Sequence, residues 1–244
     1  MIRKLFSRRT PTQPVDAWQD AEVQKLHKLG YDKLNLGCGR NPLAGWTNID
    51  GGDGKRYGAP EDDVVVKLDI FSALAEIPSD SVGYITSEQF FEHFDRHEGH
   101  RLLGEWCRVL RPGGVVRILT PDLEKEVLIY LNKLEGLDWD ATVLPHRYRH
   151  IRETSDPYGK LIEGEKYMPS MLLNNGMHMD GHKYLYDFET IKHSMELAGL
   201  TQVTRVAYGE SEHDALRGID KHDGGDTGRS WIPGIVLGVE GTKP

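Results

Sequence analysis

Short apolar segments rich in β-branched residues recur along the chain, and Gly, Pro or Asp bounds each of them. Such segments are typical of strands that are buried on both faces of a parallel sheet. Other segments repeat apolar residues every three or four positions, which predicts amphipathic helices. The alternation of the two patterns predicts parallel strands joined by right-handed helical crossovers. The expected strands are residues 33–36, 46–49, 64–68, 82–86, 115–119, 201–207 and 234–239.

Four helices are expected around these strands. The first spans residues 16–29, because Asp16 can cap its start and Gly30 can end it. The second ends at residues 111–114 (Arg-Pro-Gly-Gly), and the fourth ends at Gly199. The core-facing residues expected on the last three helices are Leu102, Leu103, Trp106, Val109 and Leu110, then Leu123, Val127, Tyr130, Leu131 and Leu134, then Phe188, Ile191, Met195 and Ala198.

The periodic pattern is lost between residues 135 and 184. This stretch is rich in His, Tyr, Arg, Met and Pro, and it is too long for an ordinary connection within a compact domain. We therefore expect residues 135–184 to form an inserted cap over the ends of the strands. The predicted organisation is an N-terminal basic segment and helix, residues 1–30, followed by one domain, residues 31–244, that carries the cap.

Composition and charge narrow the class of protein. Lys and Arg number 30 and Asp and Glu 38, a net charge of −8, which is not the basic balance typical of nucleic-acid-binding proteins. No apolar run approaches the roughly 18 residues of a membrane span, although the basic residues among positions 1–9 could make weak contact with an anionic membrane surface. The two cysteines, Cys38 and Cys107, cannot form a disulfide framework and favour the reducing cytoplasm.

A glycine turn after the first strand carries the most specific chemistry. The strand 33–36 enters Gly37-Cys38-Gly39, and Asp50 ends the next strand. Glycines allow a ligand to approach the backbone, and the N–H groups of such a turn can bind a carboxylate or phosphate. A strand-end carboxylate can accept two hydrogen bonds from a ribose diol. The pattern predicts a cofactor that contains a nucleoside.

The spacing within this segment disfavours a nicotinamide dinucleotide. The dinucleotide fingerprint needs a third glycine three residues after the second, where this chain has Pro42. The acid of that fingerprint also lies about 20 residues further on, whereas Asp50 comes sooner.

Five segments, in their order along the chain, resemble the class I S-adenosylmethionine-dependent methyltransferases, within the small group called type 11. They are residues 34–39, Asp50, residues 68–70, residues 87–94 and residues 108–114. The resemblance implies an α/β fold with a Rossmann-like, doubly wound, seven-stranded sheet, mostly parallel with the last strand antiparallel. It also implies S-adenosylmethionine as the cofactor.

The resemblance implies roles for individual residues. The methionine part of the cofactor is expected over the glycine turn and near Ser87, and Asp50 is expected to hold the ribose. Asp69 is expected to accept from the adenine amino group, with Ile70 packed on the ring. Alternatively, both acids are ordinary strand-end turn residues. Cys38 is expected to be a small residue that fits the turn rather than a nucleophile. The complete cofactor-binding set is Leu36, Gly37, Cys38, Gly39, Asp50, Gly51, Asp69, Ile70 and Ser87.

The catalytic residues are expected after the fourth strand and at the end of the cap. Neutral imidazole can accept a proton at physiological pH, so His182 is the first candidate base, or else a histidine that tethers the cap. Glu88 is the second candidate, or else a ligand of the cofactor ammonium, and His178 is the third. Residues 92 and 93 (Glu-His) are expected to be structural. The spacing of residues 178, 180 and 182 would suit a metal on an extended segment, but no metal is predicted.

Tyrosines and arginines in the cap suit a sugar ring or an anionic acceptor. The leading hypothesis is methylation of a small-molecule or glycan acceptor at a hydroxyl oxygen, in the cytoplasm and in polysaccharide biosynthesis. Methylation of tRNA or protein is an alternative, and a catalytically silent module that binds a partner is another. Fold-level resemblance does not identify the acceptor.

Overall fold

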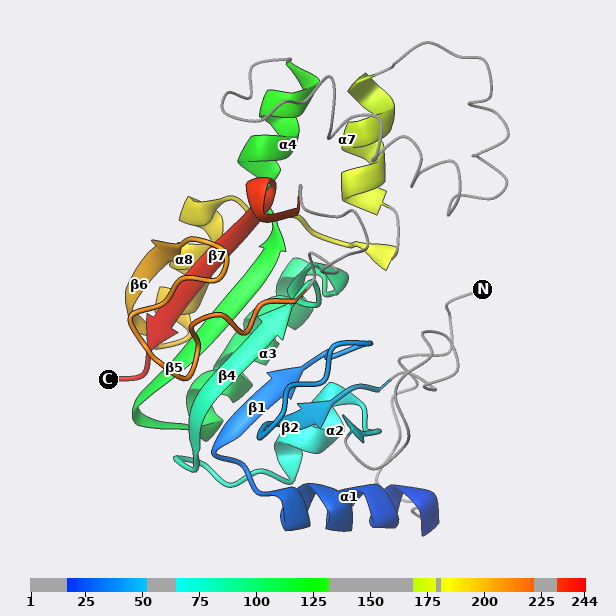
Figure 1. The fold of residues 1–244 in the computed structure, drawn as a ribbon, viewed down its shortest axis with the longest axis vertical. Helices are drawn as coiled ribbons and strands as arrows, with labels where there is room; N and C mark the ends of the chain where they lie inside the picture. The colour runs from blue at the N-terminus through cyan, green and yellow to red at the C-terminus, as the bar shows by residue number, and fades with distance from the viewer. Residues whose placement is uncertain (1–16, 52–64, 132–168, 179–180, 222–231) are drawn as a thin grey trace.

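The computed structural model describes residues 17–51, 65–131, 169–178, 181–221 and 232–244 (Figure 1). Its helices are α1 (Ala17–Leu29), α2 (Ile70–Ala75), η1 (Phe91–His93), α3 (Arg96–Val109), α4 (Leu123–Tyr130), α7 (Pro169–His178), α8 (Phe188–Leu197) and η5 (Ile232–Gly234). Its strands are β1 (Lys33–Leu36), β2 (Thr47–Ile49), β3 (Val65–Val66), β4 (Val82–Glu88), β5 (Leu110–Pro121), β6 (Thr201–Val206) and β7 (Val236–Thr242).

The seven strands form one sheet in the order β3-β2-β1-β4-β5-β7-β6. Strands β1 to β5 pair in parallel, and β7 runs antiparallel to both of its neighbours, β5 and β6. The predicted α/β class and the mostly parallel, seven-stranded sheet with an antiparallel last strand are therefore confirmed. A parallel sheet needs helical crossovers, and these supply the layer that covers it.

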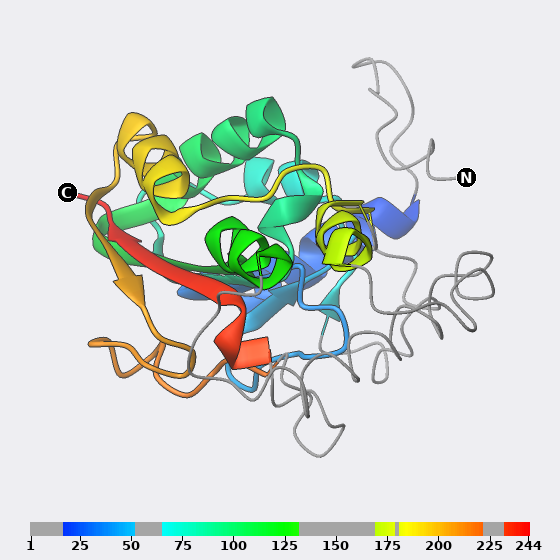
Figure 2. The ribbon, with the colours of Figure 1, turned by 90° about the horizontal axis from the view of Figure 1, so that it is seen from above.

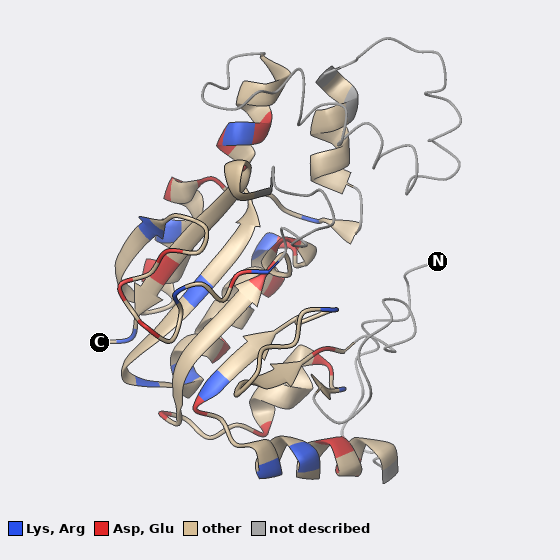
Figure 3. Cartoon of the chain, in the orientation of Figure 1, with Lys and Arg blue, Asp and Glu red and all other residues tan. Residues whose placement is uncertain are grey.

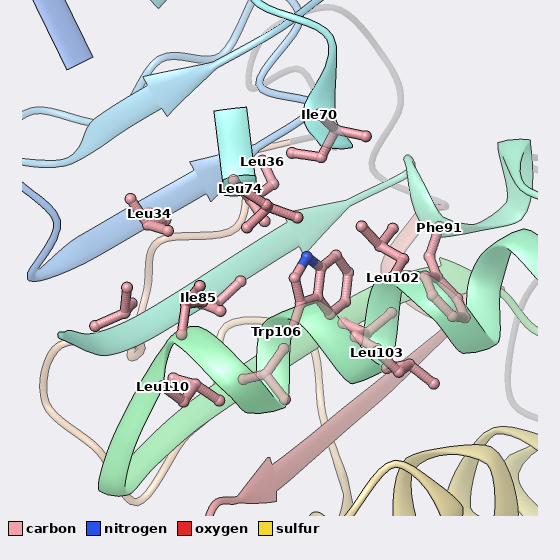
Figure 4. Packing of buried hydrophobic residues seen from close by; sticks show 14 of the residues in the cluster. Leu34, Leu36, Ile70, Leu74, Ile85, Phe91, Leu102, Leu103, Trp106 and Leu110 are labelled. Carbon is pink, nitrogen blue, oxygen red and sulfur yellow. The ribbon is translucent and has the colours of Figure 1, made fainter. Parts of the chain in front are cut away.

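A buried apolar layer joins α2, α3 and α8 to one face of the sheet, as Figure 2 shows for α3 and α8. On α3, the predicted stripe is buried, and its largest side chain, Trp106, lies between the helix and the strands (Figure 4). On α8, Ile191 and Met195 are fully buried as predicted. A capping box formed by Asp95 and Glu98 fixes the start of α3.

The connection from α3 to β5 is shorter than the sequence predicts. Residues 111–114 were expected to separate helix from strand, yet β5 begins at Leu110, directly after the helix. Gly113 has a φ of +78°, and a side chain at Gly114 would lie 2.8 Å from the Arg111 carbonyl oxygen. Gly113 and Gly114 thus allow β5 to start directly after α3, with a shift in its pairing register with β4, and no separate turn is needed.

The predicted core face of α4 is wrong. Val127, Tyr130 and Leu131 are 40%, 46% and 48% exposed, whereas Glu126 and Ile129 are buried. The helix packs on α7, where Gly176 approaches the Glu126 carboxyl group so closely that a side chain there would lie 3.1 Å from it. Periodicity predicted that the apolar side of α4 is buried. The close contact of α4 with α7 at Gly176 instead buries the side that carries Glu126 and Ile129.

The opposite face of β4 and β5 is covered by the segment 207–221, which lies across the sheet from α3 and α8 (Figure 2). Arg117 of β5 is fully buried and joins this segment to the sheet. Its guanidinium donates to Asp220 Oδ1 at 3.0 Å, to Glu240 Oε1 at 2.6 Å and to the carbonyl oxygens of Glu210 and Ala207. Five fixed donors suit this role, because every one of them can be directed at an acceptor.

Several predictions from the sequence fall on residues outside those described. They are the basic positions 1–9, the helix cap at Asp16, the strand residue Val64, residue Leu134, the cap from 135 to 168, and Asp180. Of the predicted cap, α7 and the segment 181–184 are described. None of the described helices is long and apolar enough to span a membrane. Basic and acidic positions are interspersed over the described elements (Figure 3).

Replacing Arg117 with Met should destabilise the protein by about 3–5 kcal/mol, because the buried carboxylates of Asp220 and Glu240 would lose their counter-charge. Denaturant unfolding measures the change. The matched control is Arg111→Met, which removes an exposed ion pair with Asp32 and should cost no more than about 1 kcal/mol. Equal losses in the two variants would contradict the role given to Arg117.

Candidate functional site

Three strand ends meet at one edge of the sheet. Leu36, the last residue of β1, is in register with Ile49 on β2 and with Ser87 on β4. The residues that follow, Gly37, Asp50 and Glu88, therefore lie at the carboxyl edge of neighbouring parallel strands. The strand order reverses between β1 and β4, and open α/β sheets bind ligands outside the carboxyl ends of strands at such a point.

The glycine turn is held tightly within the chain. Gly37 and Cys38 both donate their amides to the Ile49 carbonyl, at 2.8 and 3.4 Å, and Gly39 donates to Asp50 Oδ2 at 2.7 Å. The sequence predicted free N–H groups here, so the structure corrects that expectation. The Ile49 carbonyl oxygen accepts from two of these amides and the Asp50 carboxylate accepts from the third.

Gly37 meets two demands that other residues cannot. Its φ of +68° lies in the left-handed region, and the ring of Phe90 packs directly against its α-carbon, where a side chain would overlap the ring. Phe90 in turn contacts Phe94 edge to face, with ring centroids 5.0 Å apart. Phe90, from the tip of β4, is therefore a wall beside the turn that the sequence did not reveal.

Cys38 is buried in this turn. Desolvation, together with the nearby charge of Asp50, raises the pKa of its thiol to about 12. A thiol with such a pKa stays protonated at neutral pH and is a poor nucleophile. These surroundings favour the interpretation of Cys38 as a small residue that fits the turn.

The ends of β2 and β3 are in close contact. A side chain at Gly51 would lie 3.1 Å from the Leu68 carbonyl oxygen and 3.3 Å from the Asp69 α-carbon, so the two backbones touch. Asp69 Oδ1 accepts from the amides of Phe71 and Ser72, at 3.1 and 3.2 Å, and so caps α2. Ile70 is buried in the apolar core. Asp69 thus has a structural contact in addition to the adenine contact that the resemblance implies.

Two polar groups at the tip of β4 have no hydrogen-bond partner among the described residues. They are the Oγ of Ser87, a fully buried residue, and the buried Nε2 of Gln89. The backbone φ of Gln89 is +52°, which is unusual for a residue other than glycine. Buried polar groups are normally satisfied, so unsatisfied ones next to the glycine turn fit a polar ligand at this edge.

Glu88, the last residue of β4, is half-buried and accepts a hydrogen bond from the Lys221 amide at 3.0 Å. The segment 207–221, which Arg117 joins to the sheet, therefore also reaches the tip of β4. This link between two distant parts of the chain gave no signal in the sequence.

A second group of titratable side chains lies beside this tip. It consists of Glu92, His93 and His182, which we call the histidine–carboxylate cluster, and one ligand atom from each lies within 4.8 Å of the others. Burial raises the pKa of the Glu92 carboxyl group to about 8. His182 Nε2 lies 3.9 Å from Glu92 Oε1, and the side chain of His182 is 13% exposed. Residues 92 and 93 were expected to be merely structural; their proximity to His182 was missed because it arises from tertiary folding.

His178 does not lie in an extended segment with His182. It is the exposed last residue of α7, so the alternating spacing of residues 178, 180 and 182 does not apply to it. The structure thus replaces that arrangement with a different set of residues around His182.

A family model matches part of the chain. Residues 52–118 match the model of a family described as a methyltransferase domain; the match begins after the glycine turn and ends within β5. No curated protein gives a significant match.

Solved structures include similar chains at low identity. A SAM-dependent methyltransferase from Archaeoglobus fulgidus is 13% identical over 92% of this chain and 94% of its own, with a TM-score of 0.49. Phosphoethanolamine N-methyltransferase 2 of Haemonchus contortus, solved with phosphomonomethylethanolamine and S-adenosylhomocysteine, is 13% identical over 92% of this chain and 52% of its own, with a TM-score of 0.42.

The matched residues include β4, which lies next to the glycine turn, and most of β5. It lies on a mostly parallel seven-stranded sheet with the order described above. The match over residues 52–118, together with this fold, supports a class I S-adenosylmethionine-dependent methyltransferase.

Proposed function

We propose that the enzyme transfers the methyl group of S-adenosylmethionine to a hydroxyl oxygen of a small-molecule or glycan acceptor, at the edge formed by β1, β2 and β4. The observation that carries this proposal is the position of Glu88. Its carboxylate belongs to the residue directly after Ser87, which is paired with the last residue before the glycine turn. A proton acceptor next to the cofactor turn is what transfer to a hydroxyl requires.

The cofactor supplies an activated methyl group, so the protein has to bind it and align the acceptor. In this proposal the amino-acid part of the cofactor lies beside the glycine turn, where Ser87 Oγ and Gln89 Nε2 are available as partners. Asp50 holds the ribose diol with its carboxylate, which also accepts from the Gly39 amide. Asp69 and Gly51, at the joined ends of β2 and β3, lie towards the adenine.

Two residues compete for the role of general base. His182 Nδ1 lies 2.6 Å from the Gly176 carbonyl oxygen, and its Nε2 faces the buried carboxyl group of Glu92 at 3.9 Å, so the ring is directed at groups of the protein itself. One oxygen of Glu88 binds the Lys221 amide, and the residue is only half-buried. These contacts favour Glu88 as the base and His182 as a residue that positions the segment after α7. His178 would then be no more than an acceptor contact.

The acceptor class rests on the composition of the chain. A net charge of −8 disfavours RNA, and tyrosines and arginines among residues 135–184 suit a sugar ring or its phosphate. A sugar hydroxyl in polysaccharide biosynthesis is the acceptor we favour. Neither cysteine forms a disulfide, which suits the cytoplasm.

A transfer assay with radiolabelled S-adenosylmethionine tests this acceptor class. The enzyme is offered nucleotide-sugars and oligosaccharides, a bulk tRNA fraction and a protein fraction in parallel. Label in the sugar fraction, stable to mild base as an ether is, supports the proposal. Label found only in tRNA or only in protein would show that this class, and not a sugar, is the acceptor. Binding of the cofactor without methyl transfer to any fraction would favour a catalytically silent module that binds a partner.

Changing Asp50 to Ala should weaken S-adenosylmethionine binding by about 10-fold to 100-fold, because one or two charged hydrogen bonds to the ribose are lost. Asp50→Asn retains an acceptor for the Gly39 amide and separates loss of the ribose contact from loosening of the turn. Isothermal titration gives the affinity. Asp32→Ala, an exposed acid before the start of β1, is the control and should bind as the wild type does. Unchanged affinity in both Asp50 variants would exclude Asp50 from the site.

Changing Glu88 to Gln should lower kcat by about 100-fold to 10,000-fold and leave the affinity for the cofactor within about twofold, since a base acts on the acceptor and not on the donor. Steady-state kinetics on the acceptor identified above measures both. Glu212→Gln, at an exposed acid of the segment 207–221, is the control. If His182→Ala lowers kcat to this extent and Glu88→Gln does not, the base is His182.

A further inference from the structure

The histidine–carboxylate cluster brings together residues from two separate parts of the chain. Glu92 and His93 lie in η1, directly after β4, and His182 lies in the segment that leads from α7 to α8. The Lys183 and Tyr184 amides both donate to the Glu92 carbonyl, at 2.8 and 3.2 Å. The backbone therefore holds the three side chains in place from both directions.

Glu92 is a buried acid with one oxygen left unsatisfied. Its Oε2 accepts from Thr120 Oγ1 at 3.1 Å, but Oε1 has no hydrogen-bond donor among the described residues. The basic side chain that faces Glu92 Oε1 is that of His182, with Nε2 at 3.9 Å. A fully buried carboxylate oxygen of this kind needs a proton or a cation, because leaving the charge uncompensated is costly.

His182 is oriented so that one ring nitrogen faces this oxygen. Its Nδ1 lies 2.6 Å from the Gly176 carbonyl oxygen, a contact that requires Nδ1 to carry the proton. In the neutral ring, Nε2 then keeps its lone pair, and it lies 3.9 Å from Glu92 Oε1. Histidines that bind metals are fixed in the same way, by a hydrogen bond from the other ring nitrogen to a carbonyl or carboxylate.

His93 completes the group from the other side. Its ring meets the His182 ring edge to face, with the centroids 5.1 Å apart and an interplanar angle of 79°. Gly181 has a φ of +89°, and a side chain on it would lie 3.6 Å from His93 Nδ1. Glycine suits this position because of the positive φ, since a side chain would make only an ordinary contact with His93.

We propose that Glu92 Oε1, His182 Nε2 and a ring nitrogen of His93 bind a divalent transition-metal ion, with zinc as the best match, and that the ion fastens the segment after α7 to the tip of β4. Two imidazoles and one carboxylate form a ligand set that zinc accepts, with a fourth position left for water or another ligand. Around tetrahedral zinc, ligand atoms are about 3.3 Å apart, so the 3.9 Å separation would close by roughly half an ångström. This site is independent of the methyl-transfer proposal, since it takes no part in binding the donor.

Metal binding by the whole chain, prepared without a histidine tag and dialysed against a chelator, tests this site. Zinc is titrated in competition with a chromophoric chelator, and cobalt is titrated while the visible absorption of a low-symmetry site is recorded. We expect one ion per chain, and we expect His182→Ala and His93→Ala each to weaken zinc binding by about 100-fold or more, beyond the typical effect of losing a supporting residue. Zinc should also raise the unfolding temperature of the wild type and not that of the variants.

Matched controls separate this site from adventitious binding. His97 and His100 lie on the exposed side of α3, a few residues beyond η1, and their alanine variants should bind zinc as the wild type does. Because Glu92 is buried, Glu92→Gln is judged only if its circular dichroism is native; the half-buried His93 carries the test if it is not. A wild type that binds no stoichiometric ion, or a His93→Ala variant that binds as tightly as the wild type, would overturn the proposal. Failure of the methyl-transfer assay alone would not affect these outcomes.

Discussion

Parallel pairing of β1 with β2 on one side and β4 on the other is the constraint on which the site depends. It places the residues after Leu36, Ile49 and Ser87 at one edge, so that a glycine turn, Asp50 and Glu88 become neighbours. A shift of one residue in either register would turn these side chains to the other face of the sheet. The apolar layer under α2, α3 and α8 fixes the register, because it buries alternate strand residues.

Buried charge is handled in two ways near this edge. Arg117 is matched by two acids and several carbonyl groups, and it binds the segment 207–221 to the sheet. Glu92 is compensated much less, with one hydroxyl donor and a histidine at 3.9 Å. The first arrangement is a complete structural network, whereas the second has capacity left for an ion. Both lie at or next to β4 and β5, and β4 also bears Ser87 and Glu88.

The fold could be predicted from the sequence because its information is local. Strand and helix periodicity predicted the α/β class and the parallel sheet, and the glycine turn after β1 predicted a nucleoside-containing cofactor, whereas the single seven-stranded sheet with its antiparallel last strand and S-adenosylmethionine came from the resemblance to a known family. The prediction was wrong for α4, since a glycine contact with α7, and not the apolar stripe, determined its buried face. The contact of Asp50 with Gly39 and the gathering of His182 with Glu92 and His93 could not be predicted, because they join distant segments. Such contacts leave no mark on periodicity or spacing.

The crystal structure of the protein with S-adenosylhomocysteine is the most direct measurement of the central claim. The account predicts the ligand across the ends of β1, β2 and β4, with its amino-acid part within hydrogen-bond distance of Ser87 Oγ and its ribose hydroxyls on Asp50. A ligand bound at another edge of the sheet, or one that leaves Ser87 unpaired and Asp50 bound only to Gly39, would contradict it.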